Sequence, residues 1–541
     1  MIERLLKYLL PTVIFLMTVS ASFAQQRNEE ESILQLQKLA RVFNYMNSLY
    51  VDDVDMQPSV ESAIREMLAE LDPHSAYLDA EESSAEQVAL EGEFSGIGVE
   101  FNIMRDTIIV VNPVVGSPAE QVGIKANDRI IRIDTINAVG FRTTDVPKYL
   151  RGKRGTIVEV DVVRRGSSQP LHFRIRRDNI PINTLSASYM IDSEVGYIKI
   201  DRFGRTTYRE FVEAFDALKK QGLKSLVLDL RGNGGGLLEA AIELAGFFLP
   251  RESVVVSTEG RALPAQSYTA RFGGQFTRGG VVVMIDENSA SASEIVSGAL
   301  QDWDRAIIIG RSSFGKGLVQ RQIALPDRSV MRLTVARYHT PSGRVIQRPY
   351  ERGHKKEYYE SHFKRFTAEG MNDTTDSIEK PAYETKLHRR TVYGGGGIHP
   401  DIRVAVDTSG VSDYMVELVK NGIIREYTMN YLDANRTQLD QLYPDFESFD
   451  KGFNIGDDMI EQMAQLAEEN NIKRDDKGLD ESRALIERQI KALTAQRLFS
   501  TTEFYRVVNK SDSLWVGQAI RILHNWNKYS DSVLKGKITK N

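Results

Sequence analysis

The stretch VVVMIDENSASASEIVSGAL, residues 281–300, decides the fold of this chain. Its first five residues are all apolar, which is typical of a strand that is buried on both faces of a parallel sheet. A polar loop follows, and a helix is predicted from about Ser291 to Leu300. The same order of buried strand, polar loop and helix recurs in LVLDLRGNGGGLLEA, residues 226–240. This repeated unit predicts an α/β core around a central sheet.

Two further apolar runs extend the predicted core. Residues 195–200 and 306–309 are predicted as strands, and apolar residues recur at helical spacing between 208 and 218. In such folds, functional side chains gather where strands end and loops begin. We therefore expect the chemistry of this chain in the loops at 231–236 and 286–294.

Length and composition limit the classes of protein that the chain can be. At 541 residues it is too long for one hydrophobic core, so several domains are expected. It has no cysteine, which excludes disulfides, thiol nucleophiles and cysteine-based metal sites. The eight histidines form no HExxH motif or other close pair, so no metal site is predicted. A net charge of −5 disfavours nucleic-acid binding.

The first 24 residues have the pattern of a secretory signal. Arg4 and Lys7 precede an apolar run over 8–19, and small residues follow up to Ala24. The run is shorter than the ~20 residues that span a bilayer, and Pro11 interrupts it. We expect an exported, periplasmic protein, with an uncleaved membrane anchor as the alternative.

The pattern of apolar residues divides the chain into segments. They are a signal peptide at 1–24, an N-terminal helical subdomain at 28–91, a compact β-module at 92–178, the α/β core at 179–350, an exposed polar insertion that returns to the core at 351–408, and a helical C-terminal region at 409–541. The C-terminal helices carry no catalytic signature, so we expect them to cover the core.

The loop before the second helix has a simple structural explanation. SASE, residues 291–294, fits a capping box, in which the serine hydroxyl only accepts a hydrogen bond from a helix N–H. Lys316 changes this interpretation, because it lies between two glycines in an apolar setting. Burial disfavours the charged form of a lysine, and a neutral amine can deprotonate a serine hydroxyl. The two segments together predict a Ser–Lys dyad.

The β-module resembles a PDZ domain of the kind found in bacterial proteases. The resemblance rests on FSGIGV at 94–99, GSPA at 116–119 and DRII at 128–131. Asn127 stands where relatives commonly carry glycine, and asparagine can adopt the left-handed conformation that this turn needs. The resemblance implies that backbone N–H groups of one loop hold a terminal carboxylate. The residues of that loop are Phe94, Ser95, Gly96, Ile97, Gly98 and Val99.

The run NSASASEI at 288–295, with FGKG at 314–317 and Gln320 downstream, resembles the carboxyl-terminal processing (tail-specific) proteases. Further matches are LDPHS at 71–75, LTVARY at 333–338, TPSGR at 340–344 and GIHPD at 397–401. The resemblance implies a multidomain chain of the α/β and α+β classes. It implies a crotonase-like α/β protease core, an inserted PDZ module, and helical N- and C-terminal parts.

The resemblance also assigns roles to individual residues. It places the nucleophile at Ser291, the general base at Lys316, and the residue that orients this lysine at Gln320. In some relatives an aspartate eleven positions after the nucleophile takes part, and Asp302 stands there. A carboxylate near Lys316 would stabilise the charged amine, which opposes its use as a base.

The glycine-rich loop at 231–236 allows two interpretations. Its backbone N–H groups could hold a phosphate, but it lacks the Lys-Ser/Thr of a P-loop and the GxGxxG spacing of a dinucleotide fold. An oxyanion hole uses the same kind of donor. With the resemblance, the oxyanion donors are expected to be the backbone N–H groups of Gly232 and Ala292.

The expected function is that of a secreted serine endopeptidase that cleaves proteins near the C-terminus. Its partners would be protein or peptide substrates with free C-termini, including membrane-proximal ones, and no cofactor is expected. One alternative is a catalytically silent PDZ scaffold, which would not need Ser291, Lys316 and Gln320 together. Another is a crotonase-like enzyme of acyl-thioesters, which the PDZ-like module and the export signal disfavour.

Overall fold

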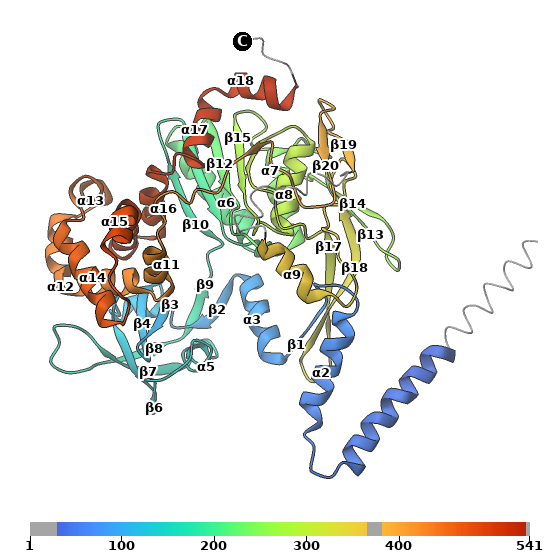
Figure 1. Ribbon diagram of the computed structural model, residues 1–541, viewed down its shortest axis with the longest axis horizontal. Helices are drawn as coiled ribbons and strands as arrows, with labels where there is room; N and C mark the ends of the chain where they lie inside the picture. Colours follow the sequence, from blue (N-terminus) through green and yellow to red (C-terminus); the bar gives the residue numbers. More distant parts are fainter. Residues whose placement is uncertain (1–29, 365–380, 537–541) are drawn as a thin grey trace, which may run out of the picture. The chain divides into compact units, whose positions relative to one another are not determined.

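The computed structural model describes residues 30–364 and 381–536 (Figure 1). The chain divides into two compact units, Met1–Leu71 and Asp72–Asn541. The predicted signal peptide at 1–24 lies outside the described residues. Within those residues, no helix combines the length and the apolar character needed to cross a membrane.

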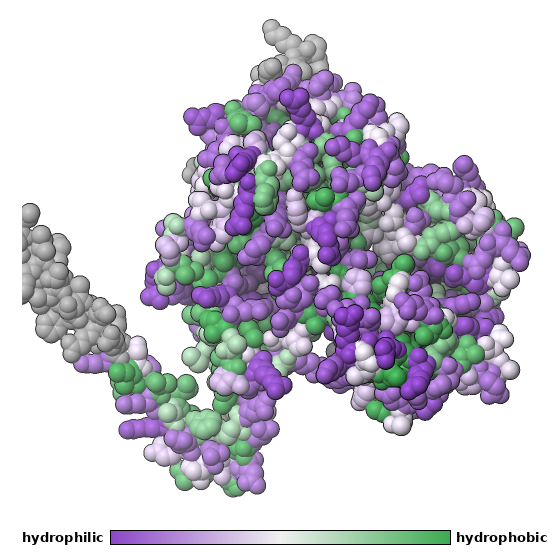
Figure 2. Space-filling view, turned by 180° about the vertical axis from the view of Figure 1, so that it is seen from behind, coloured by the Kyte–Doolittle hydropathy of each residue, from purple (hydrophilic) through white to green (hydrophobic). Residues whose placement is uncertain are grey.

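The first unit contains the two helices that the apolar spacing predicts. One helix covers residues 30–49, and α2 (Met56–Ala69) begins after Asp55, whose carboxylate accepts the Gln57 N–H (3.1 Å). Every residue from 30 to 50 is exposed, and Figure 2 shows apolar side chains in green along this helix. Leu36 is 67% exposed. Within this unit, the apolar positions of the first helix are therefore not covered.

The structure divides the predicted subdomain at 28–91. Residues from Asp72 onward belong to the second unit, because β1 (Ala76–Leu78) pairs antiparallel with β18 (Val330–His339). The helix α3 (Ala80–Glu91) follows, with Asp79 as its capping residue. This segment is therefore part of the second unit.

A six-stranded sheet forms the centre of the second unit, in the order β10-β11-β12-β15-β16-β21. From β11 onward neighbouring strands run parallel, and β10 is antiparallel to β11. The strands are β10 (Leu185–Met190), β11 (Val195–Ile200), β12 (Ser225–Asp229), β15 (Val281–Ile285), β16 (Ile307–Gly310) and β21 (Ile402–Arg403). The predicted α/β core is confirmed.

Helices cover both faces of this sheet. On one face Val283 packs in the cluster formed with α6, α7 and α8, and on the other face Val282 packs in the cluster formed with α17. Strands covered on both sides need apolar side chains at every position, which explains the unbroken apolar runs. The covering helices are α6 (Thr207–Lys220), α7 (Leu238–Phe248), α8 (Ala292–Asp302) and α17 (Val516–His524).

A second sheet adjoins the first and includes β1. Its order is β1-β18-β13-β14, and β17 also pairs with β18. The remaining strands are β13 (Val254–Glu259), β14 (Gln266–Thr269) and β17 (Leu318–Ala324). The start of β17 places Lys316 at the beginning of the β17–β18 hairpin.

The PDZ module has its own sheet and its own hydrophobic core. Its strands are β3 (Val99–Met104), β4 (Thr107–Pro113), β5 (Arg129–Ile133), β6 (Ile136–Asn137), β7 (Ile157–Val163) and β8 (Leu171–Arg176), and its helices are α4 (Pro118–Gln121) and α5 (Val146–Leu150). As predicted, α4 begins after Ser117, and Asn127 is left-handed with φ 69°.

A two-stranded ribbon connects the module to the core. β2 (Glu93–Gly96) pairs antiparallel with β9 (Asp178–Pro181), so that Glu93 lies opposite Pro181. The chain therefore enters and leaves the module through neighbouring strands.

The segment after the core is less exposed than predicted. The helix α9 (Lys355–Lys364) buries Tyr358 (5% exposed) and His362 (4%). Both rings lie against Phe314, because α9 packs beside the loop that precedes Lys316. After the gap at 365–380, β19 (Ala382–Glu384) pairs with β20 (Thr391–Tyr393), and β21 joins the central sheet.

The C-terminal helices form a further core and contact both other parts of this unit. They are α11 (Asp413–Lys420), α12 (Ile423–Leu442), α13 (Phe446–Gly452), α14 (Asp457–Glu469), α15 (Asp476–Leu498), α16 (Thr501–Lys510), α17, α18 (Trp526–Tyr529) and a π-helix at Ser530–Leu534. As expected, α17 covers the central sheet. The helices also bind the PDZ module, where Arg497 donates to the Asn127 side chain (2.8 Å).

Candidate active site

We call residues 286–291 the serine loop and residues 231–236 the glycine loop. The serine loop follows β15 and the glycine loop follows β12, and these two strands are parallel neighbours. Their carboxyl ends therefore meet at the same edge of the sheet, which is where ligands bind in open α/β sheets.

The three serines of the SASAS motif differ in what their hydroxyls do. Ser289 is fully buried and donates to the Leu230 carbonyl (2.8 Å). Ser293 is fully buried and donates to the Asn233 carbonyl (2.9 Å). Ser291 is the partly exposed member of the three, and it immediately precedes the first turn of α8. Of the three, Ser291 has the hydroxyl that is available for chemistry.

The backbone of Ser291 is strained. Its φ of 55° and ψ of −111° are rare for a residue with a side chain, and such conformations cluster at functional sites. Gly235 makes this arrangement possible, because a Cβ there would lie 2.8 Å from Ser291 Cβ and 3.0 Å from Ala292 N. The glycine loop therefore lies directly against the serine, at Gly235.

A buried carboxylate joins the serine loop to the lysine. Glu294 is fully buried in the first turn of α8. Burial raises its pKa, although hydrogen bonds to the carboxylate oppose that rise. The donors are the N–H groups of Ser291 (2.8 Å), Gly315 (2.8 Å) and Lys316 (2.9 Å) and the hydroxyl of Ser313 (2.5 Å). One side chain thus fixes both loops that carry the predicted dyad.

Lys316 is held in a tight turn and has a shifted pKa. Burial, aided by the positive charge of Arg332, lowers the pKa of its amine to about 8. Gly315 has a φ of +88°, and a Cβ at Gly317 would lie 2.7 Å from Gln347 N. The glycines on both sides are therefore required by the backbone, and the lysine is suited to lose a proton near neutral pH.

Two further side chains complete this region. The Tyr338 hydroxyl donates to the Lys316 carbonyl and makes a side-chain hydrogen bond with Ser291. Gln320 lies on β17, and its amide nitrogen is buried with no partner among the residues that the structure describes. Among the described residues, no hydrogen bond joins the Ser291 hydroxyl to the Lys316 amine. Catalytic hydrogen bonds are often long without substrate.

Asp302 is not brought to the dyad. It lies at the other end of α8, about 16 Å along the helix from Ser291 at 1.5 Å per residue. Its carboxylate pairs with the fully buried Arg344 and accepts the Ser342 N–H (2.8 Å). These contacts assign the carboxylate to a buried ion pair, so they give no support to the expected catalytic role of Asp302.

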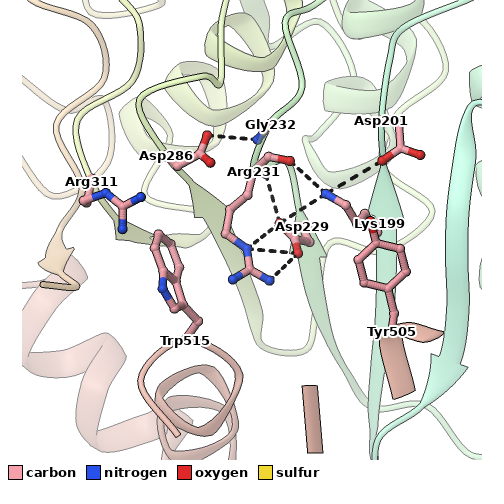
Figure 3. A pocket seen from close by; sticks show the side chains of 9 residues that line it. All are labelled: Lys199, Asp201, Asp229, Arg231, Gly232, Asp286, Arg311, Tyr505 and Trp515. Atoms are coloured by element: carbon pink, nitrogen blue, oxygen red, sulfur yellow. Dashed lines mark hydrogen bonds and ion pairs between the residues drawn. The ribbon is translucent and has the colours of Figure 1, made fainter. Parts of the chain in front are cut away.

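The predicted oxyanion donors also differ in their surroundings. The Gly232 N–H donates to the Asp286 carboxylate (2.9 Å), so it is already occupied (Figure 3). Ala292 lies at the first position of α8, where an N–H has no partner within the helix. Ala292 thus fits the expectation, whereas Gly235, the glycine that lies against Ser291, already donates its N–H to the Asn233 side chain (2.9 Å).

The PDZ loop keeps its carbonyl groups bonded within the module. The Ile97 carbonyl accepts the Ala119 N–H (2.9 Å), and the Gly98 carbonyl accepts the Val114 N–H (2.9 Å). Gly98 has a φ of +79°. The loop is followed by β3, which is an edge strand with β4 as its neighbour in the sheet. Phe94 lies under the Arg151 guanidinium (4.3 Å).

Sequence reasoning missed Glu294, Gly235 and Tyr338 as parts of the site. The capping box contained a signal for Glu294, because its third position reaches back to the serine N–H. No local pattern identified Tyr338, which reaches Ser291 from β18. Among residues 30–364 and 381–536, no group of three or more His, Asp or Glu side chains is placed to hold a metal ion.

Several parts of the chain match known families. Residues 194–353 match peptidase family S41, residues 109–164 match the PDZ domain, residues 16–82 match the N-terminal domain of the activating protease CtpB, and residues 414–500 match a family of unknown function.

Individual relatives agree with these matches. The carboxy-terminal-processing protease of Bartonella bacilliformis is 37% identical over 334 residues, 61% of this chain and 76% of that protein. The carboxy-terminal processing protease CtpA of Bacillus subtilis is 33% identical over 332 residues, 61% and 71% of the two chains. The solved photosystem II D1 C-terminal processing protease is 30% identical over 56% of this chain and 81% of that chain, with a TM-score of 0.33. The chain therefore belongs to the carboxyl-terminal processing proteases of peptidase family S41, which are serine-type peptidases, and it carries a PDZ domain.

Proposed function

We propose that this chain is an exported endopeptidase that cleaves proteins near the C-terminus with a Ser291–Lys316 dyad. The observation that carries the proposal is the Glu294 carboxylate, which holds the N–H groups of both residues. The strained, partly exposed serine supports its role as nucleophile. The lowered pKa of the lysine supports its role as base.

The proposed reaction has two stages. Ser291 Oγ attacks the carbonyl carbon of the scissile peptide bond, and the neutral Lys316 amine takes the hydroxyl proton. The ammonium then gives this proton to the leaving amine, the C–N bond breaks, and an acyl-enzyme remains. Water attacks the ester carbonyl, Lys316 again takes the proton and returns it to Ser291, and the carboxylic acid product leaves.

The oxyanion of each tetrahedral intermediate needs N–H donors beside Ser291. Ala292 N–H at the start of α8 suits this role, and the positive end of the helix dipole adds to it. The second donor would come from another N–H group of the glycine loop, because those of Gly232 and Gly235 already donate to Asp286 (2.9 Å) and Asn233 (2.9 Å). No step of this reaction calls for a cofactor.

The PDZ module is proposed to capture the free C-terminus of the substrate. The Ile97 and Gly98 carbonyls are bonded inside the module, which leaves the N–H groups of the loop as donors for a terminal carboxylate. The free edge of β3 can pair with the preceding residues of the peptide. Proteins with free C-termini, including membrane-proximal ones, are the proposed substrates.

Export rests on the sequence of residues 1–24. A cleaved signal would release the protein into the periplasm, and an uncleaved one would hold it at the membrane. The silent-scaffold alternative would leave a strained serine and a lysine of lowered pKa without a use.

The dyad is tested with Ser291→Ala in the full chain, with an unstructured protein such as casein as substrate. We expect turnover to fall by about 10³-fold or more, with an unchanged melting temperature. Ser297→Ala is the matched control, because it removes a buried hydroxyl of the same helix that bonds the Ser293 carbonyl and not the glycine loop. It should lower stability by about 1 to 3 kcal/mol and retain turnover. Parental turnover by Ser291→Ala would refute the assignment.

Carboxylate capture is tested by binding to the inactive Ser291→Ala chain. A peptide with a free, apolar C-terminal residue should bind about ten- to a hundredfold more tightly than its amidated twin, because a charge-assisted hydrogen bond contributes about 1.5 to 3 kcal/mol. Equal affinity of the two peptides would reject carboxylate capture by the module and leave the dyad assignment untouched.

A further inference from the structure

Trp515 lies at the start of α17, where the C-terminal helices meet the proposed catalytic loops. Its ring lies between two guanidinium groups, 4.8 Å from Arg231 and 5.0 Å from Arg311. Arg231 begins the glycine loop, and Arg311 makes two hydrogen bonds to Glu287 of the serine loop (2.6 and 2.8 Å). A Cβ at Gly310 would lie 2.6 Å from the same ring, so only glycine leaves room for it. Trp515 therefore contacts side chains from both sides of the proposed site.

Arg231 is fixed from two directions. Within the core its guanidinium bonds the fully buried Asp229 at 2.7 to 3.1 Å, and its carbonyl accepts from Lys199 (2.8 Å). Burial alone would raise the pKa of Asp229, but Arg231 and Lys199 hold that pKa well below its ordinary value. From the C-terminal side, Asp512 lies 3.5 Å from Arg231 Nη1. The other carboxylate oxygen of Asp512 accepts the backbone N–H of Trp515 (2.8 Å). Asp512 therefore links the start of α17 to Arg231.

A cavity of about 470 Å³ marks this junction (Figure 3). Trp515 and Tyr505 line it from the C-terminal helices, and Gly232 and Asp286 line it from the two loops. The glycine loop is therefore open to this cavity near Gly232, and Trp515 reaches the loop through its contact with the Arg231 guanidinium. A truncated Trp515 would enlarge the cavity and leave Arg231 with fewer contacts.

We propose that Trp515 and Asp512 are positioning residues of the peptidase, which act through Arg231 to hold the glycine loop against Ser291. The proposal rests on the proposed role of Ser291 as nucleophile. The tolerance of this contact is small, because a Cβ at Gly235 would already lie 2.8 Å from Ser291 Cβ. A misplacement of about 1 Å can cost about 10²-fold in rate. The C-terminal region thus supplies part of the catalytic geometry.

Trp526 provides a matched control for a purely structural role. It belongs to the same helical region, and its ring would lie 3.1 Å from a Cβ at Gly280, which precedes β15. Trp515 contacts the glycine that ends β16. Both tryptophans therefore pack on a glycine of the same parallel sheet, one at the amino ends of the strands and the other at the carboxyl ends.

The test compares kcat, KM and melting temperature of full-length Trp515→Ala, Trp515→Phe and Trp526→Ala with the parent, on one peptide substrate. Trp515→Ala should lower kcat by 10- to 100-fold, about one to two decades as for a small misplacement, with KM within about threefold. Trp515→Phe should recover most of kcat, because it restores a ring between the two guanidinium groups. Trp526→Ala should lower the melting temperature and keep kcat within about twofold.

The proposal is overturned if Trp515→Ala keeps the parental kcat, or if Trp526→Ala loses as much kcat as Trp515→Ala. If Trp515→Ala does not fold, Asp512→Asn replaces it as the test. We expect Asp512→Asn to lower kcat by about fivefold or more. Asp512→Glu should recover part of this loss. Parental kcat in Asp512→Asn would then overturn it. Ser291→Ala in the same assay separates the two hypotheses. An active Ser291→Ala chain rejects the dyad, whereas an inactive one beside a fully active Trp515→Ala rejects only the positioning role.

Discussion

The family resemblance implies that two residues at opposite ends of helix α8 are catalytic. In the structure these two residues differ in exposure, backbone conformation and bonding. At the amino end, Ser291 is partly exposed, and its backbone is strained. At the carboxyl end, Asp302 is fully buried and paired with Arg344. A carboxylate in a buried ion pair is enclosed by protein, whereas a reacting group must be able to reach the substrate. The difference teaches that position on a shared helix does not give a shared role.

Lys316→Arg should lower activity the most, because it removes the proposed base beside Ser291 at the amino end of α8. Arginine keeps the positive charge but does not deprotonate in proteins. We expect kcat/KM to fall by about 10²- to 10⁴-fold, the usual contribution of a general base, with an unchanged affinity for a C-terminal peptide. A variant that kept more than about a tenth of the parental rate would show that the position supplies only charge.

Glu294→Gln should have the next largest effect, because it weakens the link between the serine loop and the lysine. The amide nitrogen of glutamine cannot accept from the N–H groups that the carboxylate now holds. We expect stability to fall by about 1 to 3 kcal/mol and kcat by about 10- to 100-fold.

Ser313→Ala is the control for Glu294→Gln, because it removes one of the donors to the carboxylate and leaves the others. It should lower kcat less than Glu294→Gln does. Equal kcat values for Glu294→Gln and the parent would mean that the carboxylate only stabilises the fold.

The pH profile of the parent should report Lys316. Because its pKa is lowered to about 8, the amine is mostly protonated below that pH, and a protonated amine cannot accept the serine proton. We expect kcat/KM to rise about tenfold per pH unit up to pH 7 and to level off above about pH 8. A profile that levels off near pH 6 would point to a histidine instead.

Asp302→Asn should have the smallest effect on activity. The substitution leaves Arg344 buried without its counter-charge, which typically costs about 3 to 5 kcal/mol of stability. We expect a lower melting temperature, with kcat within about threefold of the parent at a temperature where both are folded. A loss of kcat comparable to that of Lys316→Arg would show that Asp302 is needed for catalysis. The proposed difference between the two ends of α8 would then be refuted.

Much of the fold could be predicted from local patterns. The unbroken apolar runs at 226–230 and 281–285 specified strands buried on both faces, and the structure has them there. The burial of α9 could not be predicted, because most of its residues are polar or charged. Tyr358 and His362 both contact Phe314, and Tyr358 also contacts His74, and these two partners lie far away in the sequence.

The site could be predicted as far as its chemistry is local. A serine at a helix start and a lysine between glycines are visible in the sequence, and the serine lies in one of the two loops expected. The oxyanion donor in the glycine loop could not be predicted locally, because Asp286 and Asn233 occupy the N–H groups of Gly232 and Gly235. The ion pair of Asp302 could not be predicted for the same reason, since its partner Arg344 lies 42 residues later.

The paired ribbon of β2 and β9 brings the two ends of the PDZ module close together, which is the geometry that domain exchange requires. Glu93 and Pro181 lie opposite each other across the ribbon, and Cα atoms of opposed residues in an antiparallel pair are about 5 Å apart. Any domain whose own ends emerge side by side could therefore be grafted at this junction without stretching the core. The C-terminal helices set further conditions, because they contact the module at Asn127 and form ion pairs with its Arg105 and Arg129. Substrate choice could thus diversify by recombination at the ribbon while the catalytic core is kept.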